Sequence, residues 1–595
     1  MQLELLDWLI ILAYFALSAG IGIAFTSRAG KSMAEFFVSG RSIPWWLAGT
    51  SMVATTFAAD TPLAVTGMVA ENGVAGNWLW WNMVMSGILT VFFYARLWRR
   101  AEVLTDVEFT ELRYSGRPAA LLRGFRALYM ALPINLIIIG WVNLAMIKIL
   151  EVTLGIDPVV AFGVMFAITM VYSVLSGLWG VLVTDFVQFF IAMGGSIILA
   201  IFALRAVGGI DGLIARLPEH YGSADAALSI VPQAGSIWMP TTAFLAYLAV
   251  QWWATSYPGA EPGGGGYIAQ RIFSARTERD GILATLWFNI AHYALRPWPW
   301  IITALCAVVL YPDVVAEDAG RGYVHAVVTL LPTGFKGLMI AAFAAAYMST
   351  IATQLNWGAS YLVNDLYLRF VNPAANEKKL VLLSRAMTGV IFLLSSVVTY
   401  WLYGKSIEGA WRIIIALGAG TGLVYILRWY WWRINAWTEI SAMVTALLTF
   451  SVLTVGGILD PTDPLEGVYV MLITTIVTTV VWVVVAYVTP PTARETLHSF
   501  YRRVRPGGAG WRQVAIDTGF GPEKVVGGAL NWTNWLAGVI SVYASLFGVG
   551  KLIFGPRAQA VLWLLLAAAA FTWIGINLSR EEARENTRIG RTRSA

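Results

Sequence analysis

PWWLAGTSMVATTFAADTPLAVTGM, residues 44–68, is apolar enough to lie in a bilayer, yet polar groups recur along it. They are Thr50, Ser51, Thr55, Thr56, Asp60 and Thr61, followed by Pro62 and Gly67. Proline lacks an N–H and clashes with the preceding turn, so carbonyls near residues 58–59 are expected to lose their helical partners. Free carbonyls inside a membrane persist only where another group satisfies them. Two explanations are open: a bound cation satisfies them, or the stretch is a kinked packing helix whose hydroxyls bond its own backbone.

The composition is that of a membrane protein. Of the 595 residues, 58% are hydrophobic and 12% are charged, whereas a soluble domain carries roughly 25% charged residues. Apolar runs recur at about the 20-residue length that crosses a bilayer, and the short alternating segments of a β-barrel are absent. We therefore expect an all-α polytopic protein in contact with the lipid bilayer. The single cysteine, Cys306, excludes an intrachain disulfide, and nucleic acid is not an expected partner.

Apolar length predicts about fifteen spans. They lie near 6–25, 44–67, 76–97, 120–150, 157–176, 182–205, 238–257, 280–311, 335–368, 380–403, 408–432, 437–458, 467–488, 531–553 and 559–578. The connections 206–237 and 312–334 are long enough for a short lid helix each, and the polar linker 489–530 separates the last two spans from the rest.

Basic residues gather in alternate loops, for example Arg96, Arg99 and Arg100 after the third span, and acidic residues gather in the others. The positive-inside rule then places the N-terminus outside and the C-terminus in the cytoplasm, which requires an odd number of spans. The first span begins with MQLELLDW, which has acids and no basic region, so it reads as a retained helix. We expect a multi-pass protein of the cell inner (plasma) membrane.

A second interrupted span is predicted at 238–270, where Pro258, Pro262 and Gly263–Gly266 cannot continue a helix cheaply. A phosphate-binding reading is weak, because Tyr267 follows the glycines where Lys and Ser/Thr would be needed. A surface loop between two spans remains the plainer alternative. Five spans run from the first interrupted span to the sixth, and five more from the second interrupted span to the eleventh. Broken helices at matching places in two halves indicate an inverted-repeat transporter.

Residues 341–350, AAFAAAYMST, place Ala346, Ser349 and Thr350 on one helix face. The small residues allow close approach of another helix, and the two hydroxyls then lie at one height. Hydroxyl oxygens together with carbonyls at a helix break would form a neutral cage for sodium. The alternative is ordinary small-residue packing, with the hydroxyls bonded to the previous turn.

Four motifs in order resemble the sodium:solute symporter family. The motifs are VSGRSIPWWLAGTSMVA at 38–54, YSVLSGLWGVLVTDFVQ at 172–188, YIAQR at 267–271 and GLMIAAFAAAYMSTIATQLN at 337–356 with NDLY at 364–367. The resemblance implies a LeuT-type five-plus-five inverted repeat with one extra N-terminal helix and about four extra C-terminal helices. It divides the chain into an N-terminal extra helix with a cytoplasmic loop (1–43), a first five-helix repeat (44–237), a second five-helix repeat (238–434), two accessory helices (435–488), a cytoplasmic linker (489–530), and two C-terminal helices with a basic tail (531–595).

The resemblance also implies sodium (Na+) as the coupling ion, bound between the first and eighth core helices. The implied ligands are the carbonyls of Ala54, Phe57 and Ala346 and the hydroxyls of Ser349 and Thr350. Asp185 matches an acidic residue that the family places near the sodium path. Its alternative role is capping a helix at the cytoplasmic edge.

The solute is less well indicated. The region 411–422 is apolar where sugar-transporting members use a Gln, and PGAEPGGGG interrupts the sixth core helix, so both features argue against a sugar. Candidates for the solute pocket are Asp60, Thr61, Trp81, Asn82, Gln251 and Trp252. An acid such as Asp60 would pair with a cationic solute group or a second ion, or form a salt bridge to an arginine at the outer gate.

The predicted function is sodium-coupled import of a small organic solute by alternating access, by a monomer or weak oligomer. The alternatives on the same fold are a sodium-independent transporter, a channel-like protein or a sensor. A sensor would append a signalling domain, for which residues 489–595 leave no room. An enzyme is not expected, because His220, His292, His325 and His498 are far apart and lack metal-ligand spacing.

Overall fold

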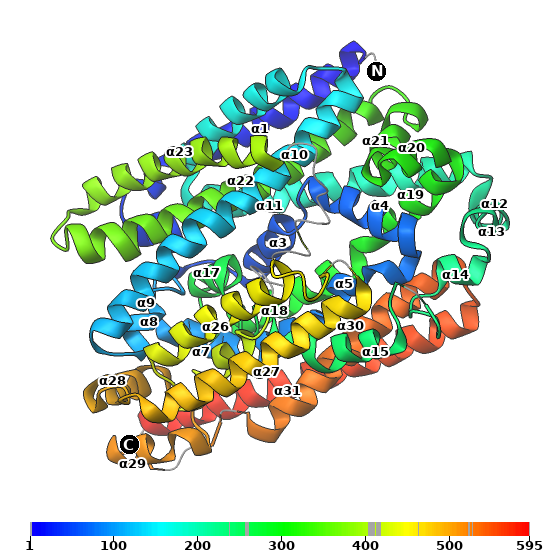
Figure 1. Cartoon of the computed structure of the whole chain (residues 1–595). Coiled ribbons are helices and arrows are strands. Elements are labelled where there is room, and N and C mark those ends of the chain that lie inside the picture. The colour runs from blue at the N-terminus through cyan, green and yellow to red at the C-terminus, as the bar shows by residue number, and fades with distance from the viewer. Residues whose placement is uncertain are drawn as a thin grey trace.

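The computed structural model is helical over the part of the chain it describes, which is residues 3–236, 238–255, 261–402, 411, 418–461, 463–521, 524–525 and 527–593. Long helices run roughly along one direction (Figure 1), and short helices close the two ends of the molecule. Among the described residues, eleven helices are long and apolar enough to cross a membrane, or twelve with one bent pair counted as a span. The protein therefore crosses the bilayer many times, as the composition predicts.

The helices that position the functional site come from both halves of the chain. In the first half they are α1 (Leu5–Ala29), α3 (Trp45–Thr55), α4 (Asp60–Asn72), α5–α7 (Trp78–Ala101, with a π-helical turn at Thr90–Tyr94), α9–α10 (Gly116–Leu154) and α11 (Pro158–Ala206). In the second half they are α15 (Thr241–Ala246), α16 (Trp252–Ala254), α17 (Gly266–Ser274), α18–α19 (Glu278–Leu310), α22 (Phe335–Ser360), α23 (Glu377–Leu402) and α25 (Gly422–Leu427). Outside this core lie α26 (Ala436–Thr454), α27 (Pro464–Val488), α30 (Gly528–Phe554) and α31 (Arg557–Arg593).

Short helices mark the two ends of the molecule. At one end lie α12 (Gly209–Arg216), α13 (Pro218–Tyr221), α20 (Pro312–Glu317) and α21 (Ala319–Leu330), so both long connections do form short helices. At the other end lie α8 (Phe109–Arg113), α28 (Arg494–Val504) and α29 (Arg512–Asp517). The N-terminus lies at the first end and the C-terminus at the second (Figure 1).

The first interrupted helix breaks earlier than the proline predicts. Helices α3 and α4 meet at 59°, and the break covers residues 56–59. Pro62 lies in the first turn of α4, where its missing N–H removes no helical hydrogen bond. The expectation of a free carbonyl at residue 58 is wrong, because Thr61 N donates to Ala58 O at 3.1 Å. The carbonyls that gain partners from other helices are those at the end of α3.

The second interrupted helix has a buried break. Residues 261–266 are all buried, so the surface-loop interpretation of the glycines is wrong for this part, whereas residues 256–260 lie outside the described residues. Gly263, Gly264 and Gly266 have positive φ, which glycine adopts without strain. A side chain at Gly265 would collide with Glu261. The glycine run therefore lets the backbone turn sharply against a buried carboxylate.

Glu261 in this break faces two buried arginines. Its Oε1 lies 3.8 Å from Arg126 Nη2 and 3.7 Å from Arg428 Nη2. Glu439 completes the cluster, at 3.0 Å from Arg126 and 3.4 Å from Arg428. Two positive and two negative groups thus offset each other, which a buried ion cluster requires. The cluster ties the second break to α9 and α26.

Two predicted spans form one helical element. The segments 157–176 and 182–205 both lie in α11, which continues through Gly177 and Gly180. Each glycine weakens a helix by about 1 kcal/mol relative to alanine, but no proline removes a hydrogen bond there. Residues 408–410 and 412–417 of the predicted span 408–432 lie outside the described residues.

Helix α22 forms the centre of the molecule, and it is buried along nearly all its length. Its run AAFAAA has no large side chain except one phenylalanine, so α1, α3, α10 and α11 pack closely against it. At its start, Asp7 Oδ1 accepts hydrogen bonds from Gly334 N and Gly337 N at 2.7 and 2.8 Å. The extra N-terminal helix therefore caps the central one.

The described part of the linker 489–530 packs against the core. Phe500, Tyr501 and Trp511 are fully buried, and Trp511 Nε1 donates to Trp429 O at 2.7 Å. Arg113 donates to Arg428 O and Trp431 O and lies over the Trp511 ring. Burial lowers the pKa of Arg113 to about 10, so its guanidinium is charged at neutral pH. Aromatic side chains of the linker therefore cover this end of the core.

We predict that Trp511→Ala lowers the free energy of unfolding by about 3–5 kcal/mol, the range for removing a buried aromatic side chain. The measurement is denaturant or thermal unfolding of the purified protein. Trp573→Ala is the control, because Trp573 is half-exposed on α31. Equal, small effects of the two changes would contradict a packed linker.

Candidate functional site

The hydroxyl of Thr350 joins the central helix to the first break. Its Oγ1 lies 2.8 Å from Thr55 O at the end of α3 and 3.2 Å from Ala346 O in its own helix. Ala346, Ser349 and Thr350 are buried, and they share the face of α22 that packs on α3. The predicted hydroxyl pair therefore faces the break and not lipid.

Asp185 lies beside this junction. Ser349 Oγ donates to its Oδ1 at 2.7 Å, and Ser51 Oγ of α3 donates to its Oδ2. Asp185 is fully buried in the interior of α11, so the alternative of a carboxylate that caps a helix at the membrane edge is wrong. A carboxylate, two hydroxyls and the end of α3 meet at one place.

Arg271 supplies the counter-charge to Asp185. The guanidinium lies 3.7 Å from Asp185 Oδ2, donates through Nε to Ser51 Oγ at 3.2 Å and through Nη2 to Thr353 Oγ1 at 2.7 Å. Because Ser51 donates in turn to Asp185, its hydroxyl relays between the two charges. The buried pair links α17, the second half of the other interrupted helix, to α3, α11 and α22.

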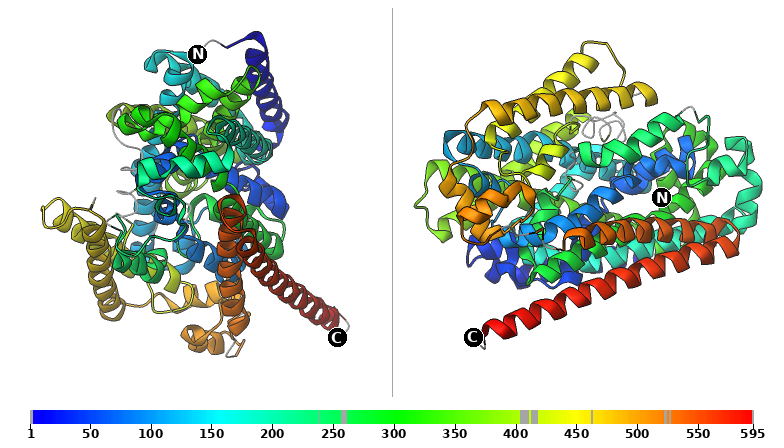
Figure 2. Two further views of the ribbon diagram at one scale, coloured as in Figure 1. Left: turned by 90° about the vertical axis from the view of Figure 1, so that its right-hand side faces the viewer. Right: turned by 90° about the horizontal axis from the view of Figure 1, so that it is seen from below.

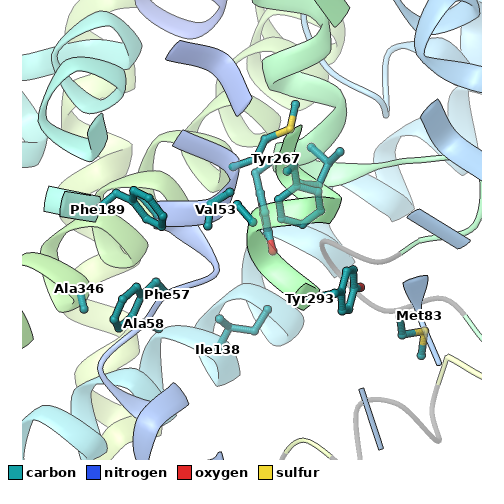
Figure 3. Close-up of a cluster of buried hydrophobic side chains, with 14 of the residues drawn as sticks. Val53, Phe57, Ala58, Met83, Ile138, Phe189, Tyr267, Tyr293 and Ala346 are labelled. Atoms are coloured by element: carbon teal, nitrogen blue, oxygen red, sulfur yellow. The ribbon is translucent and has the colours of Figure 1, made fainter. Parts of the chain in front are cut away.

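The oxygens at this junction suit a small hard cation. The Thr350 hydroxyl contacts the carbonyls of Thr55 and Ala346, and the hydroxyl of its chain neighbour Ser349 contacts the Asp185 carboxylate. Ala54 and Phe57 frame the break, and Phe57 N donates to Ala54 O at 3.0 Å. Figure 3 shows Phe57 and Ala58 drawn next to Ala346. Sequence reasoning missed Thr55, whose carbonyl is the one that Thr350 contacts.

A cavity of about 110 Å³ lies on the other side of the break. Its walls come from both halves of the chain and include Ile138, Tyr267, Tyr293 and Met83, which Figure 3 labels among the buried hydrophobic side chains. The further lining residues are Thr55, Thr56, Ala58, Asp60, Thr61, Leu79, Trp80, Trp141, Val142, His292, Arg296, Thr350, Gln354 and Trp411. Because Thr55 and Thr350 belong to both places, the ion junction and the cavity adjoin.

Polar groups in the cavity are held by short contacts. Asp60 Oδ2 accepts a hydrogen bond from Trp411 Nε1 at 3.2 Å. Arg296 Nη1 donates to Thr56 Oγ1 at 3.0 Å and to Val53 O at 3.2 Å. His292 Nδ1 and Thr56 Oγ1 share a hydrogen bond of 2.9 Å. The break is therefore tied to α19 as well as to α22.

The structure brings two of the six predicted solute residues to this cavity, Asp60 and Thr61. Trp81 is buried among aromatic rings and Asn82 donates to carbonyls of its own helix. Trp252 packs on Trp535, and Gln251 is buried away from the lining. The neighbour of Trp81, Trp80, faces the cavity instead.

Arg296, His292, Tyr267, Tyr293 and Gln354 were not predicted from the sequence as cavity residues. One signal was available for Arg296, an ionisable residue inside the predicted span 280–311 and directly before Pro297. The rule that singled out Asp60, that charged groups at membrane depth line a path, applies to Arg296 equally. The others carry no signal without knowledge of which helices meet.

We predict that a cysteine at Thr61 reacts with a small water-soluble thiol reagent, whereas one at Trp81 does not, because only Thr61 lines the cavity. The native cysteine is not expected to react with the reagent, because Cys306 is fully buried. The measurement is mass spectrometry of Thr61→Cys and Trp81→Cys after labelling. Faster labelling at position 81 would contradict the assigned walls.

Curated relatives with similar sequences are cotransporters. The chain is 25% identical over 507 residues to a sodium/mannose cotransporter of Bos taurus. The matched region covers 78% of this chain and 81% of the relative. It is 24% identical over 472 residues to a sodium/glucose cotransporter of Vibrio parahaemolyticus, covering 75% of this chain and 84% of that protein. These relatives are transporters and not enzymes.

A solved structure and a family model agree. A Na+-coupled sialic acid symporter, solved in a substrate-bound outward-open state, matches with a TM-score of 0.68 and 20% identity over 82% of this chain and 99% of its own. This likeness shows the LeuT-type fold. The model of the sodium:solute symporter family matches residues 36–448, and the chain belongs to that family.

Proposed function

We propose that this protein imports a small organic solute by coupling its passage to sodium, which binds where α22 meets the break between α3 and α4. The observation that carries the proposal is the Thr350 hydroxyl, which lies within hydrogen-bond distance of Thr55 O and Ala346 O beside Asp185. The solute binds in the adjoining cavity. Broken helices from two repeats that meet at a shared site are typical of alternating-access transporters.

Sodium at this junction would take oxygens that now contact one another. The proposed ligands are the carbonyls of Ala54, Phe57 and Ala346 and the hydroxyls of Ser349 and Thr350, with the Thr55 carbonyl added by the structure. Asp185 lies on the ion's path and attracts it. The charges of Arg271 and Asp185 offset each other. The site with one bound sodium ion therefore carries a single net positive charge.

Coupling follows from the shared residues Thr55 and Thr350. An ion that holds α3 against α22 fixes one wall of the solute cavity, so ion and solute favour the same state of the protein. One charge crossing a potential of 100 mV contributes roughly 2.3 kcal/mol to import. The N-terminus is proposed to lie outside and the C-terminus in the cytoplasm, in keeping with their positions at opposite ends (Figure 1).

A sodium-independent transporter is the second candidate, and one contact favours it. Arg271 places a permanent cation 3.7 Å from Asp185, where a resident charge can replace a coupling ion. The two candidates differ in one measurable property. Only sodium coupling makes uptake depend on external sodium at constant ionic strength.

We predict that Thr350→Val, which keeps the shape but removes the hydroxyl, raises the sodium concentration for half-maximal uptake by roughly tenfold or more, because one ligand contributes on the order of 1–3 kcal/mol. Thr350→Ser keeps the hydroxyl and should retain near-native dependence. The measurement is tracer uptake in proteoliposomes. Thr303→Val is the control, since Thr303 Oγ1 donates within its own helix. Unchanged sodium dependence in Thr350→Val would contradict the site.

We predict that Arg271→Met destabilises the sodium-free protein by about 3–5 kcal/mol, because Asp185 loses its buried counter-charge. Sodium should then restore more stability to the variant than it adds to the wild type, since the ion supplies the missing charge. Thermal unfolding in sodium and in potassium measures both effects. Arg512→Met, at an exposed position, is the control. A loss that sodium does not relieve would contradict an ion site beside Asp185.

A further inference from the structure

The cavity holds one acidic and one basic side chain that are not paired with each other. Asp60 Oδ1 is buried and has no hydrogen-bond partner, and the same is true of Arg296 Nε. Both residues are described, and no ion pair joins them. A third buried group, Gln354 Oε1, also lacks a partner. All three residues line the same cavity.

The other contacts of Asp60 and Arg296 fix their positions. Asp60 is the first residue of α4, where the positive end of the helix dipole stabilises a carboxylate. Arg296 is held by Val53 O and Thr56 Oγ1 through Nη1 and lies over the Trp300 ring. Each charge is therefore anchored on one side and leaves one polar atom unpaired.

A buried charged group without a partner lowers stability, and a ligand group of opposite charge relieves that penalty. Asp60, Arg296 and Gln354 are each at most 3% exposed. Asp60 and Arg296 act on each other electrostatically although no hydrogen bond joins them, so a ligand with a single charge would add a net charge to this buried neutral pair. An uncharged polyol would also form charge-assisted hydrogen bonds to Asp60 and Arg296, because one partner in each is ionised, but it would bring no opposite charge to either group.

The remaining walls of the cavity suit a ligand with a small apolar side chain. Leu79, Met83, Ile138 and Val142 are aliphatic, and the rings of Trp80, Trp141, Tyr267, Tyr293 and Trp411 surround them. A flat aromatic face also attracts an ammonium group. The cavity thus presents a cation acceptor, an anion acceptor and an apolar wall to a single occupant.

We propose that the solute is a small zwitterion of the amino-acid type, with its carboxylate on Arg296 Nε and its ammonium on Asp60 Oδ1 and Gln354 Oε1. This inference rests on the proposed solute role of the cavity. It separates this chain from its sodium/glucose and sodium/mannose relatives, whose named solutes carry no charge.

The first test is a thermal-shift screen of the full-length protein in sodium and in potassium. The probes are valine, alanine and proline as zwitterions, with valinamide, isovalerate and D-glucose as cationic, anionic and uncharged comparisons. We expect a zwitterion to raise the unfolding temperature in sodium but not in potassium, and we expect valinamide and isovalerate, which carry one charge each, to leave it unchanged. A shift from glucose or isovalerate that equals the zwitterion's, or no shift from any zwitterion, overturns the proposal. A shift from sodium alone that Thr350→Val abolishes shows independently that the ion site is intact.

The second test removes one charge of the cavity at a time and measures which charged probe then binds better. Asp60→Asn should weaken binding of the zwitterion by about 10- to 100-fold and shift preference toward isovalerate, and Arg296→Gln should shift preference toward valinamide. Asp211→Asn, at an exposed position on α12, is the matched control. Circular dichroism and a cooperative thermal transition show whether each variant is folded. Loss of binding for all probes alike, in folded variants, contradicts direct pairing with the solute.

Discussion

One hydrogen bond connects the parts of this structure on which transport depends, the contact between the Thr350 hydroxyl and the Thr55 carbonyl. A helix that breaks in a membrane leaves carbonyls that must find partners. Here the partners come from α22 and α19, so the break is a junction between helices and not a flexible point. The ion site and the solute cavity are the two sides of that junction.

The two interrupted helices achieve their breaks differently. The first ends at Thr55, and Thr56, held by His292 and Arg296, spans the gap. The second turns on glycines with positive φ against the buried Glu261. At the first break Arg296 donates to the Val53 carbonyl, and at the second Arg126 and Arg428 offset the charge of Glu261. Two further views of the molecule (Figure 2) show the last helix, in red, on the outside of the bundle.

The sequence predicts the architecture well because membrane spans depend on local composition. The interrupted stretches 44–68 and 238–270 and the shared face of Ala346, Ser349 and Thr350 follow from spacing alone. The predictions fail where the outcome depends on which helices meet. Pro62 indicates a kink but not its position. Glu261 has the sequence context of a loop, and only the structure places Arg126 and Arg428 beside it. Which of Trp80 and Trp81 faces the cavity depends on the rotation of their helix.

The central claim is that a sodium ion binds at the end of α3 against α22. The most direct measurement is a pair of high-resolution cryo-electron microscopy maps of the protein in sodium and in potassium. The account predicts a density peak in the sodium map alone, contacted by the oxygens of Ala346, Ser349 and Thr350, with the Thr350 hydroxyl turned from Thr55 O toward the ion. Identical maps, with that hydrogen bond unchanged and no peak, would contradict it.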